Sequence, residues 1–122
     1  MRIALFLSLL SISLYSSAQT PMSQSVLSAL KSDNVQAFLD ALNDDGLANC
    51  YSYKNSNYAP LAMTIKAGAS DTFKALLKKG VDVEKSCSSK SPLMYAAKYG
   101  QLEMAQLLVK AGADYELSLI HI

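Results

Sequence analysis

The residues that could perform chemistry in this chain are few and scattered. Its two cysteines are Cys50 and Cys87, and its one histidine is His121. Two cysteines without a further histidine do not complete the four-ligand shell that zinc prefers. The adjacent carboxylates Asp44 and Asp45 fall at an expected helix end, where solvated charge is ordinary. Because the sequence also has no glycine-rich phosphate loop, it predicts neither a metal nor a cofactor.

The C-terminal string that contains the histidine departs from the rest of the chain. Residues 117–122 read Leu-Ser-Leu-Ile-His-Ile, which resembles the translation of an adapter used in sequencing libraries. We interpret them as a non-native tail, with the natural chain continuing past Glu116; the alternative is a genuine apolar C-terminus. Without His121 no Ser-His-Asp or Cys-His arrangement is possible, so we predict that the protein is not an enzyme.

The first eighteen residues have the layout of a secretory signal peptide. Met1 and Arg2 give a positive start, residues 3–14 are apolar apart from serines, and Ser16 and Ala18 are the small residues before a cleavage site. The apolar stretch is too short for a spanning helix. We therefore expect cleavage after Ala18 and export to the periplasm or the exterior, without membrane insertion of the mature chain. The alternative is a buried N-terminal helix.

Composition sets further bounds on the mature segment. The whole chain of 122 residues allows one domain, and 51% hydrophobic residues exclude a disordered chain. Between Gln19 and Glu116 there are ten lysines and ten carboxylates, so the net charge is 10 − 10 = 0. This balance gives no electrostatic signal for nucleic acid or for an anionic membrane.

The second half of the chain repeats itself at an offset of 32 residues. Residues 60–84 align with residues 92–116 at nine identities in 25 positions. The identities include the prolines and glycines that start and end secondary structure: Pro60 with Pro92, Gly68 with Gly100, and Gly80 with Gly112. A period near this length is typical of a solenoid of stacked units.

Each unit is predicted to hold two helices. In the last unit, Ser91 and Pro92 suit a helix start, residues 93–99 form a helix that Gly100 ends, and residues 101–111 form the second helix. We expect its inner face to carry Leu102, Ala105, Leu108 and Val109. The middle unit repeats this pattern over 60–67 and 71–79. An earlier unit has apolar stripes at 26–30 and 35–42 and is more divergent, as a terminal repeat would be.

These residues carry a family resemblance. Residues 91–103, Ser-Pro-Leu-Met-Tyr-Ala-Ala-Lys-Tyr-Gly-Gln-Leu-Glu, resemble the start of an ankyrin repeat, which reads T-P-L-H-x-A-A. The resemblance implies an all-α fold, a solenoid of stacked antiparallel helix pairs with hairpin-like finger loops. It divides the chain into a capping repeat at 19–49 and repeats at 50–84 and 85–116. The family histidine is replaced by Ala62 and Met94, so its usual hydrogen bonds between repeats are not expected.

The resemblance also implies where a partner would bind. Ankyrin stacks present a concave face built from finger tips and exposed positions of the first helices. Here those positions are Tyr58, Met63, Lys66, Lys90, Tyr95, Lys98 and Tyr99. Tyrosine, methionine and long cations are typical of protein-binding hot spots. The alternative is that the tyrosines pack between repeats and the lysines only solvate the surface.

The predicted fingers have two further features, a tyrosine-rich segment and a pair of cysteines. Residues 50–58 combine tyrosine, serine and asparagine, as adaptable recognition loops do, although Tyr51 and Tyr53 could equally cover the first repeat. The resemblance places Cys50 and Cys87 in successive fingers, and export would favour a disulfide between them. Against it, they lie four and seven residues after the preceding glycine, which could separate their Cα atoms by more than roughly 7 Å.

The sequence thus predicts an exported module that binds an unidentified protein partner. The alternatives are an inhibitor or immunity factor for a toxin or envelope enzyme, and a structural accessory protein without a dissociable ligand. If the chain ends with the last repeat uncovered, we also expect self-association through that repeat.

Overall fold

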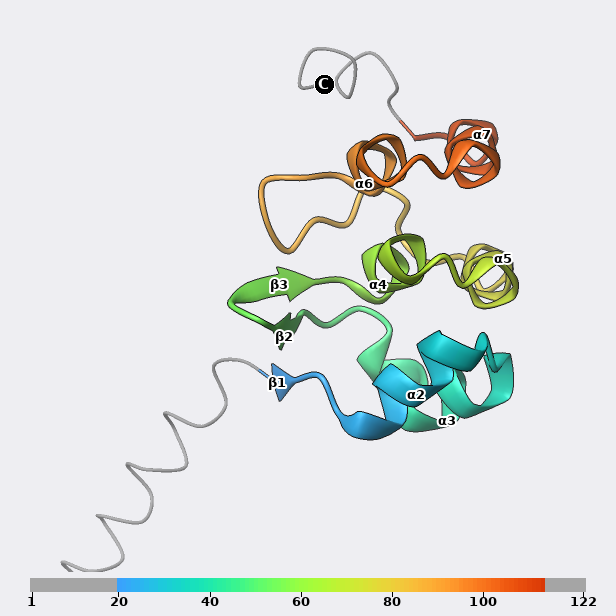
Figure 1. Cartoon of the computed structure of the whole chain (residues 1–122). Helices are drawn as coiled ribbons and strands as arrows, with labels where there is room; N and C mark the ends of the chain where they lie inside the picture. Colours follow the sequence, from blue (N-terminus) through green and yellow to red (C-terminus); the bar gives the residue numbers. More distant parts are fainter. Residues whose placement is uncertain (1–19, 114–122) are drawn as a thin grey trace, which may run out of the picture.

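The computed structural model describes residues 20–113, and the predicted signal peptide and the predicted tail lie outside this range. Along the described chain the elements are β1 (Thr20–Pro21), α2 (Gln24–Ser32), α3 (Val35–Gly46), β2 (Tyr51–Tyr53), β3 (Ser56–Tyr58), α4 (Pro60–Ala67), α5 (Ser70–Lys78), α6 (Pro92–Lys98) and α7 (Leu102–Lys110). The helices stack as three antiparallel pairs (Figure 1), so the predicted solenoid is confirmed.

Local sequence signals account for the helix bounds. The Ser91 hydroxyl accepts a hydrogen bond from the Met94 amide at 3.3 Å, and Pro92 opens α6 without losing a needed donor. Helix α4 begins at Pro60 and ends before Gly68, whose φ of 70° favours glycine. Helix α2 ends instead at Asp33, which adopts the same left-handed conformation with a φ of 51°.

The connections between the helix pairs project from one side as two fingers (Figure 1). We call residues 47–59 the first finger and residues 79–91 the second finger. In the first finger, β2 and β3 pair antiparallel, and Lys54 and Asn55 turn the hairpin with positive φ angles, as a tight two-residue turn requires. Strand β1 adds to β2 in parallel, which the sequence did not predict.

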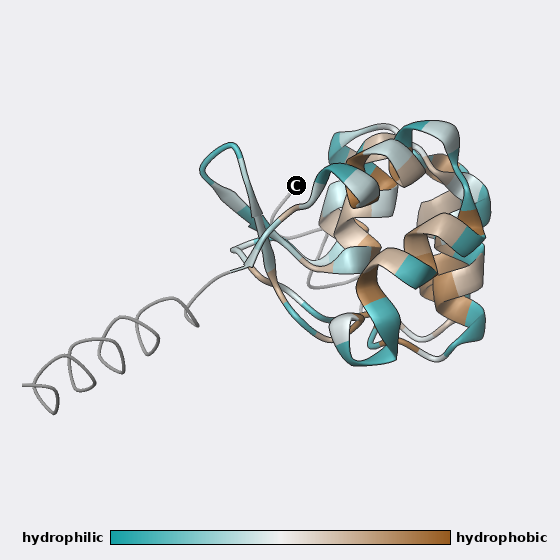
Figure 2. Ribbon diagram, turned by 90° about the horizontal axis from the view of Figure 1, so that it is seen from below, coloured by the Kyte–Doolittle hydropathy of each residue, from teal (hydrophilic) through white to brown (hydrophobic). Residues whose placement is uncertain are grey.

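The core lies between the helix pairs, and the hydrophobic stretches of ribbon in Figure 2 lie in these helices. Phe38, Phe73 and Leu76 are completely buried. The inner face predicted for the last helix is partly wrong, because Leu102 is 71% exposed and Val109 is 42% exposed. Met104 and Leu108, four residues apart, form the buried face of α7 instead.

Hydrogen bonds connect neighbouring repeats without the family histidine. The Asp33 carboxylate accepts from the Asp71 amide, the Thr72 amide and the Thr72 hydroxyl at 2.9, 2.9 and 2.7 Å. Asp33 therefore caps α5, whose own N-cap residue Ala69 has no side-chain acceptor. On the other side, the Gln101 side-chain amide donates to the Ile65 carbonyl at 3.3 Å.

A disulfide joins the two fingers. Cys50 and Cys87 are bonded, and their Cα atoms lie 5.7 Å apart, so the predicted pairing is confirmed. Cys50 lies four residues after the end of α3 and Cys87 lies nine residues after the end of α5, so the unequal offsets do not keep the two Cα atoms apart. Measured from the helix ends, 47–59 and 79–91, the fingers are equally long.

Candidate interaction surface

Four tyrosines run along the finger side of the stack and cross from the middle repeat to the last one. We call them the tyrosine row: Tyr53, Tyr58, Tyr95 and Tyr99. The Tyr58 and Tyr95 ring centroids lie 5.9 Å apart, and the Tyr95 and Tyr99 rings stack almost in parallel at 6.3 Å. Such ring pairs contribute beyond their buried area, so the rings of Tyr58, Tyr95 and Tyr99 stabilise one another.

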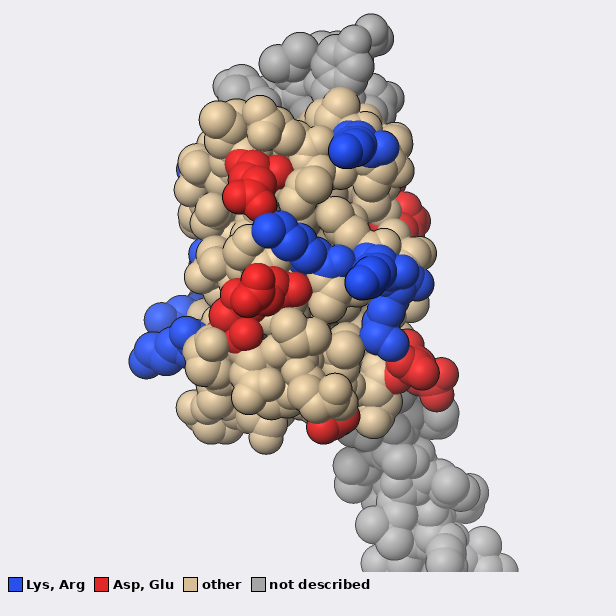
Figure 3. Space-filling view, turned by 90° about the vertical axis from the view of Figure 1, so that its right-hand side faces the viewer, with Lys and Arg blue, Asp and Glu red and all other residues tan. Residues whose placement is uncertain are grey.

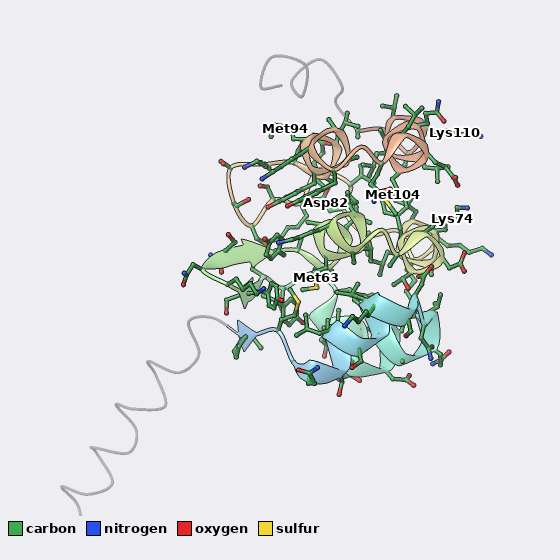
Figure 4. All side chains as sticks on the ribbon, in the orientation of Figure 1. Met63, Lys74, Asp82, Met94, Met104 and Lys110 are labelled. Atoms are coloured by element: carbon green, nitrogen blue, oxygen red, sulfur yellow. A yellow bond between two sulfur atoms is a disulfide. The ribbon has the colours of Figure 1, made fainter. Side chains whose placement is uncertain are left out.

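Burial divides the predicted partner-binding residues into two groups. Tyr58, Met63 and Tyr95 are only 6%, 2% and 6% exposed, which differs from the exposure expected of them. Figure 4 places Met63 between the hairpin and the helices below it. These side chains pack between repeats because each lies where a finger meets a first helix. Lys66 and Lys98 are exposed and Tyr99 is half-buried, so these three remain at the surface.

Lys66 links the two rings of the row that belong to the first finger. Its ammonium donates to the Tyr58 hydroxyl at 2.7 Å and lies 4.8 Å from the Tyr58 ring centroid and 5.8 Å from that of Tyr53. The bond to Tyr58 raises the pKa of Lys66, and burial opposes this only in part. Lys66 is therefore a fixed positive charge at neutral pH.

The same contact lowers the pKa of Tyr58. Burial raises the pKa of Tyr58, but the hydrogen bond and charge of Lys66, with Ser56 and Lys98, outweigh it and the net pKa lies below 10.0. We expect Lys66→Met to raise the Tyr58 pKa above 10.0, because burial then acts without the nearby ammonium. NMR titration of the tyrosine ring carbons measures this, with Lys78→Met as the control. An unchanged Tyr58 midpoint would contradict the assignment.

Lys90 takes a different place from the other predicted residues. Its carbonyl accepts from the Ser86 hydroxyl at 2.8 Å, and its amide donates to the Ser88 hydroxyl at 3.4 Å. Ser88 also shares a hydrogen bond of 2.9 Å with the Tyr95 hydroxyl. Thus the main chain of Lys90 helps to shape the second finger, and Ser88 connects that finger to the tyrosine row.

Sequence reasoning overlooked one lysine of the surface. Lys31, Lys66 and Lys98 each stand two residues before a left-handed residue that ends the first helix of a repeat. Those residues are Asp33, Gly68 and Gly100. We call the three lysines the lysine column. The alignment at an offset of 32 pairs Lys66 with Lys98; reading Asp33 as the equivalent of the two glycines would have added Lys31.

A groove opens beside Lys66, between the hairpin and helices α2 and α4. It has a volume of about 660 Å³. Tyr58 and Met63 form its floor, Met22, Leu27 and Tyr53 are half-buried in its walls, and Lys31 stands exposed at its edge. Tyr53 was noted in the sequence only as part of a loop with recognition-like composition. The site therefore combines an apolar floor with fixed positive charge, an arrangement suited to binding an anionic group that carries apolar surface.

Within residues 20–113, no group of three or more histidine, cysteine or carboxylate side chains could hold a metal ion. In the same range no helix is long and apolar enough to cross a membrane.

Comparison with known proteins agrees with this architecture. The family described as "Ankyrin repeats (3 copies)" matches residues 18–118. The ankyrin repeat domain of Bcl-3, a member of the IkappaB protein family, has a similar fold, with a TM-score of 0.53 and 23% sequence identity. The match covers 83% of this chain and 49% of that one, so this chain spans about half the length of the domain it resembles. No curated protein matches the chain.

The family match covers most of the chain, and the stacked helix pairs with projecting fingers are the structure that such repeats form. The chain therefore belongs to the ankyrin-repeat family.

Proposed function

We propose that this protein is an exported, non-catalytic module that binds a protein partner through the surface formed by the tyrosine row and the lysine column. Ankyrin repeats are protein-protein interaction modules, which supports the general class. The observation that carries the finer proposal is the row of rings with Lys66 held between Tyr53 and Tyr58. Rigid aromatic rings beside cations lose little entropy on binding, and such residues dominate binding energy at interfaces.

Export is supported by two independent features. The leader of residues 1–18 has the layout of a cleavable signal peptide. The disulfide between Cys50 and Cys87 suits an oxidising compartment such as the periplasm or the exterior. The proposal therefore includes a mature chain that begins at Gln19.

A matched pair of variants tests the binding surface. Lys98→Ala with Tyr99→Ala removes a cation and a ring at the end of α6, whereas Val109→Ala with Lys110→Ala removes an apolar side chain and a cation at the end of α7. For a partner captured by the exported protein, we expect the first variant to lower the binding affinity at least about tenfold. Hot-spot truncations typically cost more than about 1 kcal/mol of binding free energy. The second variant should retain it.

The controls and the contrary outcomes are direct. Circular dichroism melts of both variants check folding, and mass spectrometry of the exported chain checks for a start at Gln19. Loss of the partner only on changing Val109 and Lys110 would move the binding site to the end of the stack. Equal capture by all variants would rule out both surfaces.

A further inference from the structure

The charges of the described chain are unevenly distributed between its two sides. On the outer helices acidic and basic residues alternate (Figure 3). The ion pairs of Lys74 with Glu103 at 2.8 Å and of Lys79 with Asp44 at 3.5 Å both involve α5 or the residue after it. The lysine column has no such partner among the described carboxylates. Its positive charge is therefore available to a ligand.

Two grooves of similar volume show the same contrast. A groove of about 630 Å³ at the base of the fingers is lined by Asp44 and Asp82 as well as by Lys79 and Lys85, so its charges balance. The groove beside Lys66 is lined by two lysines, Lys31 and Lys66, and by no carboxylate of the described residues. Of these two grooves, only the second presents uncompensated charge.

Lys66 is also held in position to receive an anion. Its ammonium has three donors, and the Tyr58 hydroxyl uses one of them at 2.7 Å. The flanking rings of Tyr53 and Tyr58 restrict the side chain before any ligand arrives. Two donors remain for a carboxylate. Because the lysine side chain is already ordered by these contacts, it loses less conformational entropy when a carboxylate binds.

The floor and walls of the groove add a second requirement. Met63 and Tyr58 are buried beneath it, and Met22 and Leu27 are half-buried beside it. A purely ionic ligand would leave this apolar surface in water. A segment that also carries an apolar side chain would cover it and gain the corresponding hydrophobic free energy.

We propose that this groove binds an acidic segment of the partner protein, with an apolar side chain on the floor and carboxylates paired with Lys31 and Lys66. Lys98, at the equivalent position of the next repeat, extends the same positive charge along the stack. The inference rests on the proposed function and names the chemistry of the partner. Charge complementarity, with both lysines unpaired by described carboxylates, selects the acidic occupant.

The test uses random linear peptides displayed on phage and selected against the exported protein. We expect the selected peptides to be enriched in aspartate or glutamate beside an apolar residue. In synthetic copies, replacement of the acids by their amides should weaken binding about tenfold to a hundredfold, as expected for hydrogen bonds to charged groups. Affinity should also fall as the salt concentration rises.

Matched variants locate the binding. Lys31→Glu, at an exposed residue, should weaken the peptides at least about tenfold, and so should Lys66→Met. Lys66→Arg keeps the charge and should retain most of the affinity. Lys78→Glu is the control, because Lys78 also lies in the last turn of a helix, on the outer side of the stack. A thermal melt of each variant separates lost binding from lost folding.

Several outcomes would overturn the inference. These are a selection that yields no binders, binders without excess acid, or acidic binders that weaken equally with Lys78→Glu. Failure here is distinguishable from failure of the proposed function. If partner capture still depends on Lys98 and Tyr99 while Lys31→Glu has no effect, the interaction surface stands and the acidic segment in the groove does not.

Discussion

Replacing Cys50 and Cys87 together by serine is expected to lower the free energy of unfolding by about 3–4 kcal/mol. The disulfide closes a loop with a sequence separation of 37 residues, and it restricts the unfolded chain over that length. A domain of this size has a total stability of only about 5–15 kcal/mol, so the loss is a large fraction. Urea unfolding under oxidising conditions measures it, and reductant should shift the wild type alone.

The loss of stability should appear first in the second finger. Cys87 precedes Ser88, whose hydroxyl lies 2.9 Å from the Tyr95 hydroxyl, so the disulfide holds the segment that contacts the middle of the tyrosine row. Hydrogen exchange should therefore rise in residues 81–91 before it rises in α4 and α5. Identical unfolding midpoints for the wild type and the double variant would show that the bond does not stabilise the stack.

Replacing Asp33 by glycine should cost about 2–3 kcal/mol of unfolding free energy. The change removes the three hydrogen bonds that Asp33 accepts from Asp71 and Thr72, and it leaves the start of α5 without a side-chain cap. Glycine is chosen because it adopts the φ of 51° at this position, so the loss reports the cap. Asp33→Asn, which keeps one acceptor oxygen, should lose less. If Asp33→Gly lowered the unfolding free energy no more than replacing an exposed turn residue does, the capping role of Asp33 would be contradicted.

The same carboxylate predicts a pH dependence. Burial raises the pKa of Asp33, but the hydrogen bonds from Asp71 and Thr72 outweigh it and bring the net pKa below 3.8. The folded state therefore favours the ionised form, so its contribution is complete above pH 3.8 and is lost as the pH falls through the lower folded value. The stability difference between the wild type and Asp33→Asn should shrink below pH 3.8. A constant difference down to acidic pH would contradict the shift.

The positions of the helices could be predicted from the sequence alone because their signals are local. Pro60 and Pro92 are the first residues of α4 and α6, a position that suits proline because no helical hydrogen bond needs its missing amide. Gly68 and Gly100 adopt the left-handed conformation that ends a helix. The period of the repeat then determined the stacking, since each pair must bury its apolar face against the next. The pairing of Cys50 with Cys87 followed from placing both in successive fingers.

What only the tertiary structure decided depends on residues far apart in the chain. Asp33 is an ordinary helix-end residue until α5 is packed beside it, when its carboxylate meets amides nearly forty residues away. Likewise, the pattern alone could not tell that Tyr58 and Tyr95 are buried while Tyr99 remains half-exposed. Exposure depends on how the fingers lie over the first helices, and long-range packing sets that position, whereas local backbone preference sets the helices themselves.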